Sequence, residues 1–368
     1  MKSRKATPTN YLPNVALLGI QTPYNKTKNI DSYYEEFINL VKSNEVSYDN
    51  VIFMKLREIH PVYFLSKGKL EELKKFCDEH KVEQLIISEP LTAQQERNLS
   101  DYLDCKVFDR TKLILEIFEK HAHSAEGKAQ VEIAMLQHKK TRLAGKGIHL
   151  SQQSGIVGKI GGAGETAKEK ETRELNRKIL NLKRKLETIQ KSRDTQRKRR
   201  FRSNIPHLCL IGYTNAGKST ILNLLTKSNV LAEDKLFATL DTTTRELYLN
   251  GKKKGVISDS VGFIQQIPHN LIEAFKSTLD ELRYADMLLH VVDLSDPNWE
   301  SQIKTVHEIL QELEINKEML YIFNKIDKVE NLEQVKQEVE KYQPHVLTCA
   351  KSKDGIVELK SKLAKWSK

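Results

Sequence analysis

The sequence predicts an α/β protein in three successive parts: an N-terminal α/β unit (residues 1–125), a helical hairpin with a glycine-rich loop (126–200) and a C-terminal domain with a mostly parallel sheet (201–368). In the first and last parts, short apolar runs alternate with helix-length segments, which is the pattern of parallel sheets. The middle part instead has helical periodicity interrupted by glycines. A chain of 368 residues is long enough for several such units, each with its own core.

Composition excludes several classes of protein. The chain is 39% hydrophobic and 30% charged and has no long uncharged run, so we expect neither disorder nor a membrane span. No apolar segment follows the basic start MKSRKATPTN, which predicts a cytoplasmic protein without a secretory signal, and we expect a monomer. The four cysteines are far apart, which favours reduced thiols in ordinary packing over disulfides or a zinc site. They are Cys77, Cys105, Cys209 and Cys349.

The N-terminal part predicts a small sheet with helices between its strands. Four short apolar runs predict strands, and three amphipathic stretches predict helices. No pattern in this part predicts catalytic chemistry by itself. The expected strands are Val15–Ile20, Val51–Met54, Val62–Ser66 and Gln84–Glu89, and the expected helices are Ser32–Lys42, Lys69–Glu79 and Ala93–Leu103.

The middle part predicts two helices joined by a loop. Gly127–Arg142 lacks internal glycine and proline, and the glycine-rich loop spans Gly145–Glu165. Thr166–Lys191 has apolar residues at alternating spacings of four and three, which is the seam of a paired helix. Lys191–Pro206 is then expected to be a linker. The seam residues are Leu175, Ile179, Leu182, Leu186 and Ile189.

Positive charge is concentrated in the same part of the chain. The net charge is +11, and residues 168–202 contain fifteen Lys and Arg against five Asp and Glu, which is a local excess of +10. Such a run indicates either a polyanionic partner or a solvated helix face.

The C-terminal part predicts a doubly wound sheet, whose ligands bind at the carboxyl ends of the strands. Motifs with recognisable chemistry follow directly after several of these strands. The expected strands are Leu208–Gly212, Gly255–Asp259, Met287–Asp293, Met319–Lys325 and His345–Cys349, with a final helix over Gly355–Lys368.

The first of these strands leads into a phosphate-binding loop, the P-loop of a G domain. The loop matches the GxxxxGK[ST] pattern and an apolar helix follows it, as this motif requires. Backbone N–H groups of such a loop surround phosphates, Lys218 would reach the β- and γ-phosphates, and the Ser219 hydroxyl would ligate Mg²⁺. The predicted nucleotide contacts are Gly212, Tyr213, Thr214, Asn215, Ala216, Gly217, Lys218 and Ser219.

Two further motifs predict the two ends of the site: DxxG, at Asp259–Gly262, the catalytic end, and NKxD, at Asn324–Asp327, the base end. Asp259 closes a strand 40 residues after Ser219, where its carboxylate would hold the Mg²⁺ shell, and the Gly262 amide would sense the γ-phosphate. Asp327 would accept from N1–H and the 2-amino group of guanine, donors that adenine lacks, so GTP is the expected substrate. We predict Lys218, Asp259 and Gly262 as catalytic residues, and Ser260, Val261, Asn324, Lys325, Ile326 and Asp327 as further nucleotide contacts.

The remaining nucleotide contacts are expected in two loops. A Thr-rich segment occupies the place of the first switch loop, where Thr239 is the expected second Mg²⁺ ligand and Thr243 and Thr244 are the alternatives. After the last strand, the Ala350 amide is a candidate donor to guanine O6. The expected contacts in these loops are Phe237, Ala238, Thr239, Leu240, Asp241, Cys349, Ala350 and Lys351.

Two positions differ from small signalling GTPases. Phe263 follows the DxxG motif and cannot orient an attacking water, which predicts slow intrinsic hydrolysis assisted by another group or by a partner. Gln265 and Gln266 are nearby candidates for that role, although polar residues are ordinary in such a loop. Asn215 either places its side-chain oxygen on a potassium ion or forms the turn of the loop.

Taken in order, the motifs resemble those of a known family. The set GYTNAGKST, FATLD, DSVGF, NKID and CAK is similar to the HflX family of translation-associated GTPases. Segments before the G domain resemble the same family, so the likeness covers nearly the whole chain. These segments are SKGKLEEL, LTAQQERNL, VFDRTKLILEIF, EGKAQVEIAML and GGAGETAKEKETRE.

The resemblance implies a GTPase that binds the large ribosomal subunit and its rRNA, and that splits ribosomes or rescues stalled ones under stress. It directs the glycine loop, here Gly161, Gly162 and Gly164, toward the peptidyl transferase region. The alternatives are an assembly or storage factor that uses GTP as a checkpoint, and a binding module with a vestigial G domain. The chain departs from the family at Ala163 and Thr242, where proline is usual, and at Cys349, where serine is usual.

Overall fold

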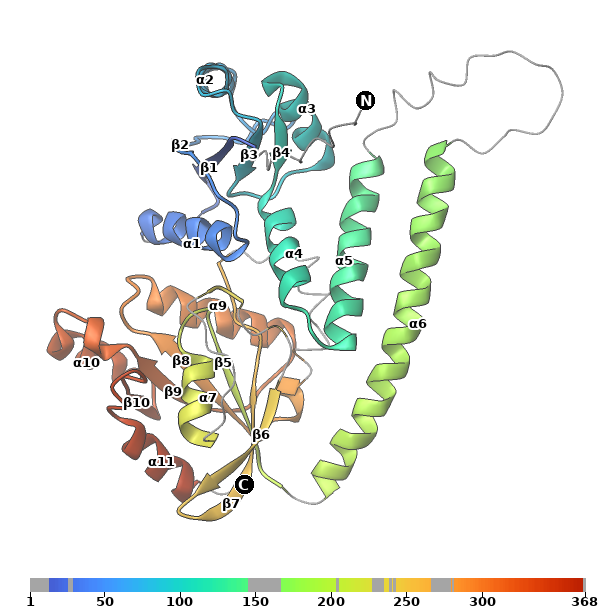
Figure 1. The fold of residues 1–368 in the computed structure, drawn as a ribbon. Helices are drawn as coiled ribbons and strands as arrows, with labels where there is room; N and C mark the ends of the chain where they lie inside the picture. Colours follow the sequence, from blue (N-terminus) through green and yellow to red (C-terminus); the bar gives the residue numbers. More distant parts are fainter. Residues whose placement is uncertain are drawn as a thin grey trace, which may run out of the picture. The chain divides into compact units, whose positions relative to one another are not determined.

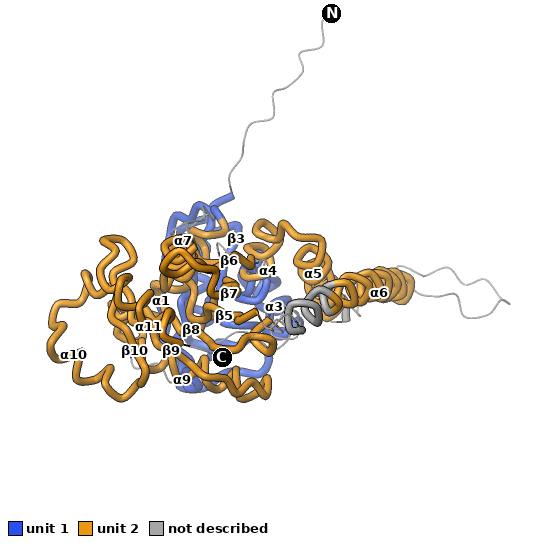
Figure 2. Tube along the Cα trace, turned by 90° about the horizontal axis from the view of Figure 1, so that it is seen from below, with its two compact units in different colours: residues 1–26, 45–113 blue, residues 27–44, 114–368 orange. Residues whose placement is uncertain are grey.

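The computed structural model describes residues 13–25, 29–144, 167–202, 205–226, 235–237, 240, 243–265, 279 and 281–366. The chain forms two compact units. The first comprises residues 1–26 and 45–113, and the second residues 27–44 and 114–368 (Figure 2). Each unit contains a largely parallel sheet with helices between its strands, which confirms the predicted α/β fold class.

The first unit is built on a four-stranded parallel sheet in the order β2-β1-β3-β4 (Figure 1). All but the last residue of β1 is buried, as expected for an inner strand of a parallel sheet. Three of the four predicted strands are confirmed, whereas β4 was not expected. The elements are β1 (Val15–Gln21), β2 (Asn50–Lys55), α2 (Lys67–Glu79), β3 (Gln84–Ile87), α3 (Ala93–Leu103) and β4 (Lys106–Phe108).

The predicted strand at Val62–Ser66 is wrong, because these residues form a turn. His60 and Phe64 exchange backbone hydrogen bonds of 3.1 and 2.8 Å, and the φ angle of Phe64 is 65°. The His60 ring nitrogen Nδ1 accepts from the backbone N–H groups of Val62 and Tyr63 at 3.2 and 3.3 Å. These N–H groups are therefore not used for pairing with a neighbouring strand. Phe64 and Leu65 of this run are buried in the core, whereas Val62 is exposed.

The second unit contains a six-stranded sheet in the order β10-β9-β8-β5-β7-β6. All pairings are parallel except that of β6 with β7. The five predicted strands are confirmed, and the antiparallel edge strand β6 was not expected. The elements are β5 (His207–Gly212), α7 (Lys218–Thr226), β6 (Thr243–Leu249), β7 (Lys252–Asp259), β8 (Met287–Asp293), α9 (Trp299–Glu312), β9 (Glu318–Asn324), the 3₁₀ helix Ile326–Lys328, α10 (Leu332–Val339), β10 (His345–Leu347) and α11 (Ile356–Lys365).

The order of this sheet brings the sequence motifs together. β5 is central and pairs with both β7 and β8, so that Leu210 is opposite Asp259 and Gly212 is opposite Val291. β9 lies beside β8, with Asn324 opposite Asp293. The carboxyl ends of these parallel strands therefore meet at one edge of the sheet, where a doubly wound fold binds its ligands.

Helix α1 (Ile30–Ser43) belongs to the second unit, although it lies between β1 and β2 in the sequence. Asn29, its N-cap, exchanges two hydrogen bonds with Asn298, of 3.2 and 3.1 Å. The Ser32 hydroxyl donates to Asp296 at 3.1 Å. These bonds join the start of α1 to the loop that precedes α9.

Two long helices, α5 (Ala125–Ala144) and α6 (Ala167–Arg202), run side by side in opposite directions (Figure 1). Lys139 near the end of α5 pairs with Glu171 near the start of α6 at 3.1 Å. Of the predicted seam residues, Leu175 is buried and the other four are half-buried, while Asn176, Arg177 and Lys178 are exposed. The glycine loop of the hairpin lies outside the described residues.

The predicted linker at Lys191–Pro206 is wrong over most of its length, because α6 continues to Arg202. Residues 191–202 contain neither glycine nor proline and are mostly strong helix formers, which explains why the helix continues through them. Helix α4 (Arg110–His121), which precedes α5, was also not expected. Among the described residues, no helix has the length and apolar composition needed to cross a membrane.

Candidate nucleotide-binding site

The P-loop has a backbone that only glycine can adopt at two positions. Gly212 has a φ angle of 141°, and a Cβ atom there would lie 2.1 Å from the carbonyl oxygen of Val291. Gly217 has a φ angle of 98°, and its Cβ would lie 2.3 Å from Nδ2 of Asn324. Asn215 also has a positive φ of 61°, which supports its turn-forming role.

Lys218 is buried within this loop. Its ammonium donates to the carbonyl oxygens of Gly212 at 3.1 Å and Tyr213 at 2.7 Å. Burial lowers the pKa of Lys218 to about 8, and the nearby carboxylate of Asp259 opposes that shift. The partners of the ammonium are therefore neutral carbonyl groups. A bound phosphate would carry negative charge and would favour the charged form of the lysine.

A hydroxyl and a carboxylate meet beside the start of α7. The Ser219 hydroxyl donates to Oδ2 of Asp259 at 2.7 Å. Both groups offer oxygen, the ligand that Mg²⁺ prefers, so the donor set fits this metal. The Thr244 hydroxyl lies 2.9 Å from that of Ser258, whereas the buried Thr243 hydroxyl bonds to none of the described residues.

The DxxG segment lies against the P-loop. Thr214 N–H donates to the Phe263 carbonyl at 2.7 Å, and Phe263 N–H donates to the Gly212 carbonyl at 3.1 Å. A Cβ at Gly262 would lie 2.7 Å from the Thr214 side chain and 2.9 Å from Nζ of Lys218. The backbone of Gly262 therefore passes directly beside the lysine, and the Phe263 ring is buried.

Asn324 joins the P-loop to the two base-reading segments. Its Nδ2 donates to the Ala216 carbonyl at 2.9 Å. Its Oδ1 accepts from the Ala350 N–H at 2.9 Å and from the Thr348 hydroxyl at 3.3 Å. Because the Ala350 amide already donates to Asn324, a contact with guanine O6 would have to share that hydrogen.

Asp327 and Lys325 are oriented by neighbours at the same edge. The Cys349 thiol donates to Oδ1 of Asp327 at 3.0 Å, and this bond lowers the pKa of Asp327. Lys325 has a φ of 62° and pairs through Nζ with Asp293 at 2.7 Å. The Asp327 carboxylate is exposed, and is therefore accessible to a base.

Helices α1 and α4 contact two segments beside the site, one at Leu236 and Phe237 and the other at Gln265, which sequence reasoning missed. The rings of Phe118 and Phe237 pack edge to face, with centroids 4.6 Å apart. Leu236 N–H donates to the Ser43 hydroxyl at 2.9 Å, and Gln265 N–H donates to Glu36 at 3.1 Å. Neither α4 itself nor the surface that it meets was expected from the sequence.

The structure therefore brings together most of the predicted site residues. The P-loop, DxxG, NKxD and CAK residues all lie at one end of the six-stranded sheet. Phe237 and Leu240 are buried. Ala238, Thr239 and Asp241 lie outside the described residues, as does Gln266.

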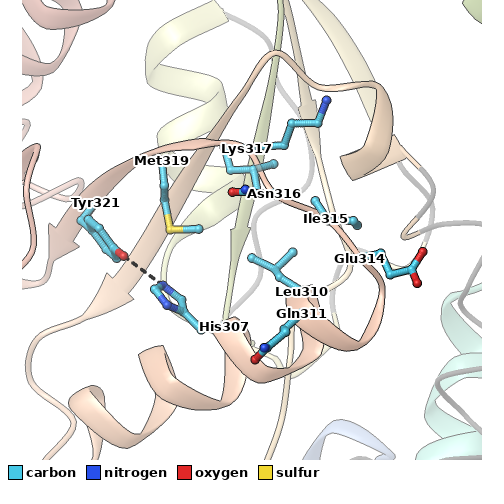
Figure 3. A pocket seen from close by; sticks show the side chains of 10 residues that line it. His307, Leu310, Gln311, Glu314, Ile315, Asn316, Lys317, Met319 and Tyr321 are labelled. Atoms are coloured by element: carbon cyan, nitrogen blue, oxygen red, sulfur yellow. Dashed lines mark hydrogen bonds between the residues drawn. The ribbon is translucent and has the colours of Figure 1, made fainter.

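A separate pocket of about 570 Å³ lies between α9 and β9 (Figure 3). Tyr321 and His307 hydrogen-bond across it at 2.9 Å. Its lining includes Leu288 and Met319 at the amino ends of their strands, the opposite edge from the motifs. It is therefore not part of the nucleotide site.

Three family models match the chain in succession. A model described as GTP-binding GTPase N-terminal matches residues 31–119, and GTP-binding GTPase Middle Region matches residues 121–200. A model described as 50S ribosome-binding GTPase matches residues 207–325. The last of these spans the P-loop and the DxxG segment and ends within the NKxD motif, before Asp327.

Relatives over most of the chain agree with these matches. GTPase HflX from Caldanaerobacter subterraneus is 44% identical over 301 residues, which are 80% of this chain and 70% of the relative. GTPase HflX from Escherichia coli is 39% identical over 88% of this chain and 76% of the relative. A crystal structure of a GTP-binding protein from Sulfolobus solfataricus in complex with GDP is 26% identical, covers 96% of this chain and 98% of its own, and has a TM-score of 0.50. The chain thus belongs to the HflX family of GTPases, and its activity is the hydrolysis of GTP.

Proposed function

We propose that this GTPase binds the large ribosomal subunit through its rRNA, and that the nucleotide state of the G domain sets the affinity. GTP orders the switch segments, the ordered form binds, and hydrolysis releases it. In this role the protein acts in the cytoplasm as a monomer and splits or rescues ribosomes under stress. The observation that carries the proposal is a strongly basic helical hairpin attached to a complete set of GTPase motifs.

The phosphate end of the site is assigned from the contacts of Lys218 and Asp259. Lys218 exchanges its carbonyl partners for the β- and γ-phosphate oxygens, and the Gly262 amide donates to the γ-phosphate. Ser219 and Asp259 hold Mg²⁺, with Thr239 as the proposed ligand from the switch segment. When bound, Mg²⁺ neutralises phosphate charge as it develops.

The base end is assigned from Asp327 and its neighbours. Asp327 accepts two hydrogen bonds from guanine, and the Cys349 thiol at 3.0 Å holds the carboxylate in position. Lys325 is fixed by Asp293 at 2.7 Å, beside the place of the base. These contacts support a site specific for GTP over ATP, because adenine leaves the carboxylate without donors.

The attacking water must be positioned by a group other than the Phe263 side chain. Phe263 is buried and apolar, so it offers no hydrogen-bonding group to water. We propose that the ribosome stimulates hydrolysis by supplying or ordering that group. A potassium ion held by Asn215 is the alternative source of charge stabilisation.

The surface proposed to meet rRNA is α6. This helix contains fifteen basic residues and only five acidic ones, and Lys183, Arg184 and Lys185 are exposed. A long basic helix follows RNA phosphates without reading sequence. The family model described as 50S ribosome-binding GTPase supports the same class of partner.

An assembly or storage factor for the large subunit is the second candidate, because that same description names only one subunit. The two functions differ in their effect on intact ribosomes. Incubation of the protein and GTP with 70S particles, followed by sedimentation, separates them. Dissociation into subunits supports splitting, whereas binding to free large subunits without dissociation supports the assembly role.

A further inference from the structure

Helix α1 presents a carboxylate to the segment that follows the DxxG motif. The Gln265 N–H donates to Oε2 of Glu36 at 3.1 Å. Glu36 is half-buried, whereas the adjacent Glu35 is exposed. Glu35 forms no hydrogen bond or ion pair with any residue that the structure describes. The two neighbouring glutamates therefore differ in one respect that matters here, which is contact with the segment beside the nucleotide site.

The position of Glu36 is fixed because α1 is held at both ends and along one face. At the start of the helix, Asn29 and Asn298 exchange two hydrogen bonds of 3.2 and 3.1 Å. At its end, the Ser43 hydroxyl accepts from the Leu236 N–H at 2.9 Å. A side chain on a helix that is anchored in this way is a more precise support than a loop. The fully buried apolar residues of α1 are Tyr33, Phe37, Leu40 and Val41.

The DxxG segment is tied to the P-loop on one side and to α1 on the other. Phe263 exchanges backbone hydrogen bonds of 2.7 and 3.1 Å with the P-loop, and two residues later Glu36 holds the Gln265 N–H. Gly262 lies directly before these two anchors, and a Cβ atom there would lie 2.9 Å from Nζ of Lys218. The anchored backbone is thus next to the lysine that is assigned to the γ-phosphate.

We propose that Glu36 is a positioning residue for GTP hydrolysis, which acts by holding Gln265 so that the Gly262 amide keeps its place at the γ-phosphate. Hydrogen-bond donors stabilise a transition state best when they are fixed before charge develops. Without Glu36, the segment after Gly262 would lose one of its anchors, and ordering it would add to the barrier. The proposal rests on the phosphate end of the site proposed above. It does not depend on the ribosomal partner, because Glu36, Gln265 and the P-loop all belong to the second unit.

Three substitutions of Glu36 separate the hydrogen bond from the charge. Glu36→Gln keeps the length of the side chain and an acceptor oxygen but removes the charge. Glu36→Asp keeps the charge but is one methylene shorter, so that its oxygens no longer reach the Gln265 N–H. Glu36→Ala removes both. Glu35→Ala is the matched control, because it removes an exposed carboxylate from the adjacent position of the same helix.

The measurement is single-turnover hydrolysis of GTP by the full chain, with protein in excess and without ribosomes. We expect Glu36→Ala and Glu36→Asp to lower the rate about tenfold, the size expected for loss of a hydrogen bond to a charged group. Glu36→Gln should retain most of the rate, and Glu35→Ala all of it. GDP affinity and the melting temperature should stay unchanged in Glu36→Asp, because the proposed effect concerns the γ-phosphate alone.

Several results would overturn the role of Glu36. These are an unchanged or raised rate in Glu36→Ala, equal losses in Glu36→Gln and Glu36→Asp, or a fall in GDP affinity and melting temperature that matches the fall in rate. If Glu36→Ala fails to fold, the comparison of the Gln and Asp variants decides.

A variant of Gly262 tests the site on which the proposal rests. Gly262→Ala should abolish hydrolysis, because the added Cβ would lie 2.7 Å from the Thr214 side chain and 2.9 Å from Nζ of Lys218. Normal hydrolysis by Gly262→Ala would overturn the proposed phosphate end together with the role of Glu36. Normal hydrolysis by Glu36→Ala and Glu36→Asp, with Gly262→Ala inactive, would overturn only the role of Glu36.

Discussion

The ring of Phe118 in α4 packs edge to face against Phe237 of the switch segment, with centroids 4.6 Å apart and ring planes at 78°. Phe118 and Phe237 are both buried. Phe237 lies two residues before Thr239, the proposed Mg²⁺ ligand, in the sequence. Ser43 at the end of α1 holds the adjacent Leu236 N–H at 2.9 Å.

Replacing Phe118 by Ala should weaken GTP binding more than GDP binding. In the proposed site the switch segment contacts only the γ-phosphate, so its release should lower GTP affinity about fivefold, since an aromatic pair contributes about 1 kcal/mol beyond burial. Titration with both nucleotides measures the ratio, and Phe118→Leu serves as the control that keeps apolar volume. Equal losses for GTP and GDP would show that the contact supports only folding.

Nucleotide affinity should fall above a pH of about 8. The pKa of Lys218 is lowered to about 8 by burial, and bound phosphates favour its charged form. Below that pH the lysine is protonated before binding, so affinity is flat. Above it, binding must take up a proton, and affinity should fall by up to about tenfold per pH unit. A flat GDP affinity across this range would contradict the placement of Lys218, and Lys218→Met should remove both the affinity and its pH dependence.

Asp327→Asn should exchange guanine preference for xanthine preference. In the proposed site the carboxylate accepts from the 2-amino group of guanine, whereas an amide would donate to the 2-oxo group of xanthine. Loss of a charged hydrogen-bond partner costs about 1.5–3 kcal/mol, so GTP affinity should fall about 10- to 100-fold. Unchanged preference for GTP over xanthosine triphosphate would remove Asp327 from the base site.

The Cys349 thiol should contribute to the same preference. Its donation to Asp327 at 3.0 Å positions the carboxylate, so Cys349→Ala should weaken GTP binding. Cys349→Ser keeps a donor and should bind GTP at least as well as the unaltered protein. If alanine and serine variants bind alike, the thiol does not orient Asp327.

Charge reversal on α6 should weaken binding to large subunits and reduce its salt dependence. Lys183, Arg184 and Lys185 are exposed, and removal of one ion pair with a phosphate lowers the slope of log affinity against log salt by about 0.7–0.9. The control reverses three exposed lysines elsewhere, Lys304, Lys341 and Lys353. Equal effects of both triples would indicate non-specific attraction instead of a surface on α6.

The G domain could be predicted closely from the sequence because its signals are local. Each motif follows an apolar strand directly, and Gly212 and Gly217 are required by the backbone of the loop itself. The parallel order of the sheet then brings the motifs to one edge without further information. Thr239 lies outside the described residues, so its role stays a prediction.

Long-range packing was much less predictable. Val62–Ser66 has the composition of a strand, but two of its backbone N–H groups donate to the His60 ring, and Phe64 is buried in the core. The segment therefore forms a turn and not a strand. Nothing in the sequence of α1 says that Glu36 and Ser43 meet the switch segments, because such contacts depend on residues more than 190 positions away. The extent of α6 could have been predicted, since no glycine or proline interrupts it before Pro206.

The central claim is that the ribosome is the activating partner of this GTPase. GTP turnover, measured with and without purified large subunits in potassium and in sodium buffers, tests it most directly. We predict slow turnover alone and a large stimulation by subunits in both buffers, because the buried Phe263 cannot position water. Turnover that responds to potassium but not to subunits would contradict the claim and would make Asn215 the source of catalysis.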